Sequence, residues 1–202
     1  MPNRKSDTVA QSTKAARAKN AFVLERLFDA PREHVWNAFT QPEHLKRWWG
    51  SPGSSIEIAR FELKPGGLFH YCMKLPDNRV MWARFIFREI VAPERLSWLN
   101  GFSDKDGGLT RNPWVPGFPL ETLNTVTLAA EDGGTLLTIT VVPFNADDGE
   151  TRVFEGGIKG MKMGFGASFS KLADYLQRQS RLRDSQARSE ESDTPPITKE
   201  KT

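Results

Sequence analysis

The last apolar run of the chain, between residues 145 and 176, predicts a long amphipathic helix. Large apolar side chains recur there at steps of three and four, which is typical of one face of an α-helix. They are Phe154, Ile158, Met161, Phe165, Phe169, Leu172 and Leu176. Asn145 is a suitable cap, and the acidic residues after it complement the positive end of the helix dipole. About thirty residues give a helix roughly 45 Å long.

Seven segments before this helix alternate between apolar and polar residues, a pattern that predicts β-strands. They span residues 20–28, 56–63, 68–73, 80–91, 95–102, 123–130 and 136–142. Short turns join neighbouring strands, which favours antiparallel pairing. Two short helices fit after the first strand, with Asp29 and the Thr40-Gln41-Pro42-Glu43 capping box as start signals. The sequence therefore predicts an α+β helix-grip fold, in which a seven-stranded antiparallel sheet wraps around the C-terminal helix.

The alternation also predicts which side chains face that helix. In the last strand Leu137 and Ile139 alternate with threonines, so the two apolar residues should point inward. In the longest strand Arg84 marks the outer face, and Phe85 and Phe87 should therefore point inward.

A row of small residues interrupts the predicted helix. Gly156, Gly160, Gly164 and Ser168 lie four apart, and a glycine inside a helix costs up to about 1 kcal/mol relative to alanine. Either the helix backbone approaches the sheet closely or bends there, or the small residues leave open volume that a ligand can fill. Both interpretations stay open from the sequence.

The two ends of the chain differ in composition from the rest. Residues 1–19 and 178–202 are rich in charged and small polar residues, which predicts two disordered tails around one domain of residues 20–177. The tails carry 11 of the 28 basic residues and 6 of the 25 acidic ones, so the domain itself is mildly acidic. This distribution argues against a nucleic-acid-binding face on the domain.

Cellular location is inferred from features that the sequence lacks. Cys72 is the single cysteine and fits a small core residue in a reducing compartment. The sequence shows neither a signal peptide nor an apolar run long enough to span a membrane. We therefore expect a cytoplasmic protein.

No set of side chains in the sequence predicts a catalytic centre, a metal site or a cofactor site. His34, His44 and His70 each lack a partner at a metal-ligand spacing. Cys72 is about 7 Å from His70 along an extended strand, too far for direct activation. His70 is expected to be a satisfied core or rim residue, with ligand contact or acid–base work as the alternative.

Several motifs in order resemble the family related to the activator of the heat-shock-chaperone ATPase, within the START and polyketide-cyclase (SRPBCC) superfamily. They are Asp29-Ala30-Pro31, Val35-Trp36, Leu45-x-x-Trp48-Trp49-Gly50, Lys64-Pro65-Gly66-Gly67 and the segment from Phe87 to Leu96. The resemblance covers residues 22–176 and implies an internal cavity between the sheet and the last helix. Its members include ligand carriers, cyclase-like enzymes and chaperone regulators, so the resemblance implies no single activity.

This chain departs from the family pattern in three places. Phe85 stands where relatives often have glycine, and Gly164-Phe165 stands where they often have Gly-Trp. The loop of residues 104–120 is also longer and richer in aromatic residues than in the simplest members.

Large rings are abundant, and indole and phenyl faces suit an apolar or aromatic guest. Trp114 and Phe118 lie in the Gly- and Pro-rich loop, which is long enough to act as a lid. The residues predicted to form the cavity and its mouth are Trp49, His70, Trp82, Phe85, Phe87, Trp98, Trp114, Phe118, Met161 and Phe165.

Three functions follow from these observations. The first is non-catalytic binding of a small hydrophobic or aromatic ligand in the cavity. The second is a cyclase or dehydratase that uses the same cavity, with His70, Tyr71 or Glu89 moving a proton. The third, implied by the family resemblance, is regulation of a chaperone or another protein partner. A monomer and a homodimer are both compatible with the sequence.

Overall fold

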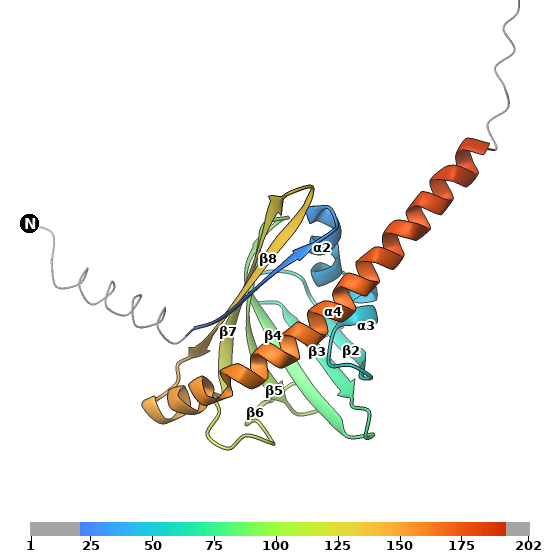
Figure 1. Cartoon of the computed structure of the whole chain (residues 1–202). Helices are drawn as coiled ribbons and strands as arrows, with labels where there is room; N and C mark the ends of the chain where they lie inside the picture. Colours follow the sequence, from blue (N-terminus) through green and yellow to red (C-terminus); the bar gives the residue numbers. More distant parts are fainter. Residues whose placement is uncertain (1–20, 193–202) are drawn as a thin grey trace, which may run out of the picture.

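The computed structural model describes residues 21–192 and consists of one curved sheet with a long helix across its concave side (Figure 1). The predicted tail of residues 1–19 and the last ten residues lie outside the described part. In chain order the elements are β1 (Phe22–Phe28), α2 (Arg32–Thr40), α3 (Pro42–Trp48), β2 (Ser55–Phe61), β3 (Leu68–Lys74), β4 (Val80–Val91), β5 (Arg95–Ser103), β6 (Leu109–Thr110), β7 (Glu121–Glu131), β8 (Gly134–Phe144) and α4 (Asp148–Ser192).

The strands form an open antiparallel sheet in the order β1-β8-β7-β5-β4-β3-β2, and the two-residue strand β6 pairs with β5. The β7–β8 turn has positive φ at Asp132 (48°) and Gly133 (78°), which matches the right-handed twist of a tight hairpin. The predicted helix grip is confirmed, with β6 as an eighth strand that the sequence pattern did not show.

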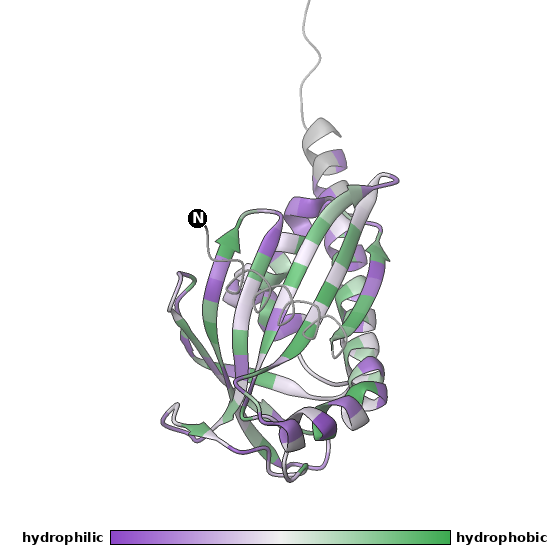
Figure 2. Ribbon diagram, turned by 90° about the vertical axis from the view of Figure 1, so that its left-hand side faces the viewer, coloured by the Kyte–Doolittle hydropathy of each residue, from purple (hydrophilic) through white to green (hydrophobic). Residues whose placement is uncertain are grey.

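The alternation of the strands decides which residues form the core. Leu137 and Ile139 are fully buried, and Phe85 and Phe87 are 4% and 1% exposed, as predicted. Figure 2 shows the hydrophobic and hydrophilic bands that result along the strands. The inward side chains pack against α4, which buries Phe154, Phe169, Leu172, Tyr175 and Leu176.

The short helices α2 and α3 begin differently from the prediction. Pro31 precedes α2 and Gln41 precedes α3, and neither helix start has a side-chain cap. Thr40 belongs to the last turn of α2, where its hydroxyl donates to the carbonyl of Trp36 (2.8 Å), and Gln41 takes the N-cap position of α3. A buried contact instead holds α2 and α3 together: the side chain of Trp48 is buried, and its indole N–H donates to the carbonyl of Ala38 (2.8 Å).

Asp147 rather than Asn145 caps α4. The Asp147 carboxylate accepts the backbone N–H of Glu150 (2.8 Å), and the Glu150 carboxylate accepts the N–H of Asp147 (3.2 Å). This reciprocal pair is a capping box. Asn145 instead has a positive φ of 49° and turns the chain between β8 and the helix.

The far end of α4 runs past residue 177, where the predicted domain ends. The helix does not stop near Gln177 but continues to Ser192 and projects beyond the sheet (Figure 1). Arginine, glutamine and glutamate have good helix propensity, and a helix already formed by packing can propagate at little cost. Residues 178–192, which the composition placed in a tail, are thus helical in the structure.

Replacing Phe169 tests whether the grip on α4 holds the fold together. Phe169 is fully buried and lies edge-on to Phe28 at 6.1 Å, so Phe169→Ala should lower the free energy of unfolding by about 3–5 kcal/mol. Met163 lies on the same helix but is 69% exposed, and Met163→Ala should change stability by less than about 0.5 kcal/mol. Urea unfolding measures both, and equal losses would contradict this description of the core.

Candidate functional site

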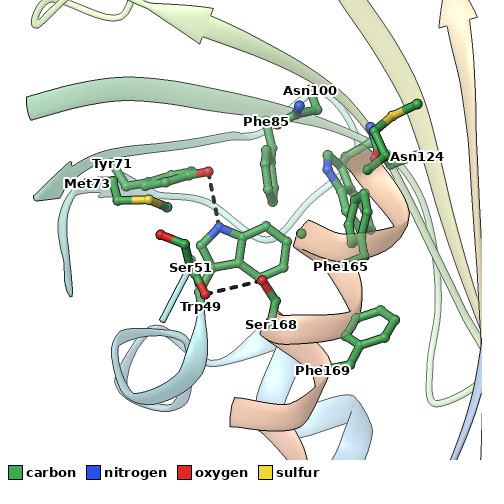
Figure 3. A pocket seen from close by; sticks show the side chains of 14 residues that line it. Trp49, Ser51, Tyr71, Met73, Phe85, Asn100, Asn124, Phe165, Ser168 and Phe169 are labelled. Carbon is green, nitrogen blue, oxygen red and sulfur yellow. Dashed lines mark hydrogen bonds between the residues drawn. The ribbon is translucent and has the colours of Figure 1, made fainter. Parts of the chain in front are cut away.

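A cavity of about 280 Å³ lies between the concave face of the sheet, the residues after α3 and the middle of α4 (Figure 3). Residues from strands β3, β4, β5 and β7, from the segment after α3 and from helix α4 meet there. The lining residues are Trp49, Gly50, Ser51, Tyr71, Met73, Phe85, Trp98, Asn100, Asn124, Met161, Gly164, Phe165, Ser168 and Phe169.

Aromatic rings form the wall of this cavity on the sheet side. Phe85 stacks on Trp98 with ring centroids 5.0 Å apart, and Trp49 meets Phe85 edge-on at 5.4 Å. Phe165 of α4 stacks on Phe22 at 5.5 Å. Each ring is held by a neighbouring ring, so the wall is preformed and apolar.

Trp49 and Tyr71 join the α3 segment to β3. The indole N–H of Trp49 donates to the Tyr71 hydroxyl (3.1 Å), as the dashed line in Figure 3 marks. Burial raises the pKa of Tyr71 to about 12, so its phenol is neutral at ordinary pH. Since the hydroxyl oxygen already accepts a hydrogen bond from Trp49, its own proton can serve a further acceptor.

The same face of the sheet also carries the amide side chains of Asn100 and Asn124. Asn124 is directly opposite Trp98 in the β5–β7 pairing, and Asn100 follows Trp98 on the same face of β5. The Asn124 amide nitrogen donates to the carbonyl and the hydroxyl of Thr122 (3.2 and 3.0 Å). The indole nitrogen of Trp98 is buried without a hydrogen-bond partner in the described structure.

Two residues of α4 hold the loop at the rim of the cavity. The Ser168 hydroxyl donates to the carbonyl of Gly50 (3.2 Å), and the Lys171 ammonium donates to the carbonyl of Ser51 (3.2 Å). Burial lowers the pKa of Lys171. The loop after α3 is thereby tied to the helix that closes the other side of the cavity.

The surroundings of the glycines exclude one of the explanations offered for the glycine row. A Cβ atom added at Gly156, Gly160 or Gly164 would meet nothing within 4 Å, so close approach to the sheet does not explain these glycines. Gly164 lines the cavity, and residues 155–168 of α4 are exposed or only partly buried. Gly156 and Gly160 are exposed, and of the row only Gly164 and Ser168 border the cavity.

Five of the ten residues proposed from the sequence line this cavity: Trp49, Phe85, Trp98, Met161 and Phe165. His70 and Trp82 do not, because they lie on the outer face of the sheet. Their rings stack on each other at 4.8 Å, and the His70 ring is 3.1 Å from the carbonyl oxygen of Asp104. Of the two roles predicted for His70, these contacts fit a structural residue whose hydrogen-bonding capacity is met, and not one that contacts a ligand.

Phe87, Trp114 and Phe118 also lie outside the cavity lining. Phe87 points inward but packs against Phe61 at 5.9 Å, farther along the core. Phe118 packs on Phe154 of α4 at 5.9 Å. Trp114 is 44% exposed and lies edge-on to Phe102 at 5.7 Å. The predicted lid is therefore fastened to the start of α4, where Arg111 also pairs with Glu150.

Sequence reasoning missed the polar lining residues, although a signal was present. Asn100 and Asn124 occupy inward positions of β5 and β7, in phase with the buried Trp98 and Val126. A polar side chain at an inward position of a strand needs a hydrogen-bond partner. Such a residue in the sequence can therefore indicate a cavity.

The other chemically competent side chains face away from the cavity. Cys72 is half-buried on the outer face rather than in the core, and burial raises the pKa of its thiol. Glu89 is exposed and pairs with Arg95 (2.8 Å). His44 is 2.9 Å from the Tyr175 hydroxyl. Within residues 21–192, no three His, Cys, Asp or Glu side chains converge as a metal site would require, and none of the helices described there is suited to crossing a bilayer.

Comparison with known families now identifies the chain. Residues 29–177 match the sequence model of the family "Activator of Hsp90 ATPase homolog 1-like protein". The match spans most of the chain, so the protein belongs to this family. A search of curated proteins finds no match.

Solved structures share the fold. A protein from Arthrobacter aurescens is 27% identical with a TM-score of 0.66, and the match covers 78% of this chain and 86% of that one. One from Nitrosomonas europaea is 26% identical with a TM-score of 0.63, covering 80% and 96%. A Mycobacterium smegmatis protein is 22% identical with a TM-score of 0.66, covering 81% and 94%, and shows likeness of fold alone.

The raised pKa of Tyr71 predicts an alkaline loss of stability. An unfolded phenol ionises near pH 10, whereas folded Tyr71 keeps its proton to about pH 12. The contribution of protonated Tyr71 to the free energy of unfolding is therefore fully present below pH 10. It is lost as the pH rises from about 10 to about 12, and the loss amounts to up to roughly 2–3 kcal/mol. Urea unfolding at pH 9 and pH 11.5 should show this loss for the natural chain and a smaller loss for Tyr71→Phe. An undiminished loss in Tyr71→Phe would assign the effect elsewhere.

Proposed function

We propose that this protein binds a small hydrophobic or aromatic molecule, without chemical conversion, in the cavity between the sheet and α4. The observation that carries the proposal is the preformed aromatic wall beside open volume at Gly164. Ligand sites are typically concave, mostly apolar and lined by a few polar groups, which describes this cavity.

The size of the cavity limits the ligand. A dry cavity of about 150 Å³ holds benzene, so a volume of about 280 Å³ suits a molecule of one or two rings. Phe85, which stands where relatives often have glycine, occupies part of the space. Long fatty acids and flavonoids with three rings are therefore expected to bind less well than bicyclic compounds.

The cyclase or dehydratase alternative loses two of its three proposed proton-transfer residues. His70 and Glu89 lie on the outer face, and only Tyr71 lines the cavity. Its high pKa makes Tyr71 a poor base and a good hydrogen-bond donor, a role that suits holding a ligand. Regulation of a chaperone stays a prediction from the family resemblance, and so does the choice between monomer and homodimer.

A matched pair of glycine variants tests the proposal. Gly164→Leu places a side chain in the open volume of the cavity, whereas Gly160→Leu places the same side chain one turn away, outside the lining. Both replace glycine in a helix, so both should raise the free energy of unfolding by up to about 1 kcal/mol.

The ligand readout separates the two variants. A panel of one-ring and two-ring aromatic compounds should raise the melting temperature of the natural chain, since a ligand at 100 times its Kd contributes about 2.7 kcal/mol. Gly160→Leu should keep this shift and Gly164→Leu should lose most of it. No shift with any compound, or an equal shift in both variants, would refute binding at this site.

A further inference from the structure

The mouth of the cavity lies between the loop after α3 and one edge of α4. Of the lining residues there, Gly164 is exposed, and Ser51 and Ser168 are only partly buried. Lining residues on the sheet, such as Tyr71 and Trp98, are buried. A Cβ atom added at Gly164 would meet nothing within 4 Å, so the space beside this edge of the helix is open. A ligand in the cavity is therefore accessible to solvent on this side.

Lys171 places a positive charge at this mouth. It follows Gly164 by seven residues and Ser168 by three, so the three side chains share one edge of the helix. Helical side chains lean toward the N-terminal end of their helix, which for Lys171 is the direction of the cavity. Its ammonium is 3.2 Å from the carbonyl oxygen of Ser51 and 3.5 Å from that of Gly50, and both residues line the cavity. The flexible stem of a lysine lets the ammonium reach an acceptor beside Ser51.

The charge of Lys171 is not balanced by an opposite charge in the described part of the chain. None of the ion pairs found within residues 21–192 includes this lysine. Burial is the cause of its lowered pKa. Its two described hydrogen bonds go to backbone carbonyls, which do not neutralise an ammonium, and an ammonium has a third N–H to donate. An anion at the mouth would supply the missing counter-charge.

The interior of the cavity contains no charge of either sign. No Asp, Glu, Lys or Arg belongs to its lining. Its polar side chains are neutral hydroxyls, indoles and carboxamides, namely those of Ser51, Ser168, Tyr71, Trp49, Trp98, Asn100 and Asn124. An ionised group deep in this lining would be unpaired, which is costly, whereas the same group at the mouth keeps contact with water and meets Lys171.

Taken with the proposed function, on which this inference rests, these features define the class of ligand. We propose that the cavity takes a small aromatic carboxylate, whose ring lies inside and whose carboxylate lies at the mouth beside the Lys171 ammonium. The rings of Phe85, Trp49 and Phe165 contact the hydrocarbon part. The carboxylate accepts a hydrogen bond from Lys171, which is stronger than one between neutral groups because both partners are charged.

The neutral donors of the lining do not by themselves favour an ion. A hydroxyl or a carboxamide can donate to the oxygen of a carboxylate or to that of an uncharged amide, but the carboxylate costs more to remove from water. The Ser168 hydroxyl already donates to Gly50, and the Trp49 indole donates to Tyr71. The indole nitrogen of Trp98 is buried, so a ligand is not expected to reach it. A preference for the ion therefore reports a cation.

The experiment uses two molecules of the same shape that differ in charge. 2-Naphthoate is ionised at neutral pH, and 2-naphthamide carries an uncharged carboxamide on the same fused rings. An ion pair at a partly exposed position contributes up to about 1 kcal/mol, which corresponds to about fivefold in affinity. Calorimetric titration of the full chain should therefore give a Kd for 2-naphthoate about five times lower than that for 2-naphthamide. This preference should shrink at high salt, which screens the ion pair.

Substitutions at Lys171 separate its charge from its hydrogen bonds. Lys171→Gln keeps an N–H donor for the loop carbonyls but removes the charge, so the preference should fall to about one while 2-naphthamide still binds. Lys171→Arg keeps the charge and should keep the preference. Lys159 is an exposed residue of the same helix outside the lining, and Lys159→Gln, which removes the same charge there, should also keep the preference.

The neutral donors are tested in the same way. Each variant removes one donor group and should change the Kd values of the two compounds by similar factors, so the preference for 2-naphthoate should persist. The variants are Ser51→Ala, Ser168→Ala, Tyr71→Phe, Trp49→Phe, Asn100→Ala and Asn124→Ala.

The position of the ring is measured in the natural chain. Met73 and Met161 line the cavity, whereas Met163 is 69% exposed on the same helix as Met161. With ¹³C-labelled methionine methyl groups, the ring protons of both compounds should show nuclear Overhauser effects to Met73 and Met161 and none to Met163.

The results that would overturn the inference are distinguishable from failure of the proposed function. Equal Kd values in the natural chain, or tighter binding of the amide, would leave aromatic binding intact and remove the carboxylate. A preference that survives Lys171→Gln, or that disappears in Lys159→Gln or in a neutral-donor variant, would place the anion elsewhere. Loss of both compounds in Lys171→Gln would make this lysine a structural residue of the loop. Binding of neither compound to the natural chain, or Overhauser effects to Met163 alone, would count against the proposed function itself.

Discussion

The contact between α4 and the concave face of the sheet is the constraint on which the rest of the structure depends. The helix is anchored near its start by Phe154 and around its middle by Phe169, Leu172 and Leu176, all of which are buried. Between these anchors the helix carries glycines and only partly buried side chains. Because a rigid rod held at two places spans the gap between them, a cavity forms under the middle without breaking the core.

The two faces of the sheet have different tasks. The inner face carries the aromatic wall and the amides of Asn100 and Asn124. The outer face holds the His70–Trp82 stack and Arg84, which donates to the carbonyl of Gly107 (2.9 Å) and thereby fastens the turn after β5. The histidine that looked like a candidate for chemistry is thus part of a structural cluster, and the polar chemistry of the cavity comes from neutral side chains.

The family and the fold leave the ligand open, because many functions occur on the same scaffold. Three local features shape the cavity in the described structure: the ring of Phe85, the glycine row of α4 and the buried ring of Trp98. Each affects a different property of the site. Phe85 takes up part of its volume, Gly164 keeps its helix side open, and Trp98 adds an aromatic surface to its wall.

The sequence by itself determined the seven longer strands, their antiparallel character and the inward placement of Phe85 and Leu137, because periods of two and 3.6 residues are local properties. The same period, applied to Trp82, puts it on the face of Arg84 and so outside the cavity. Only the tertiary structure decided which inward rings border open space, since that depends on where α4 crosses the sheet. The tertiary structure also decided where Trp114 and Phe118 lie. Their loop has no alternation of apolar and polar residues to predict its position, and the two rings are placed by contacts with Phe102 and Phe154.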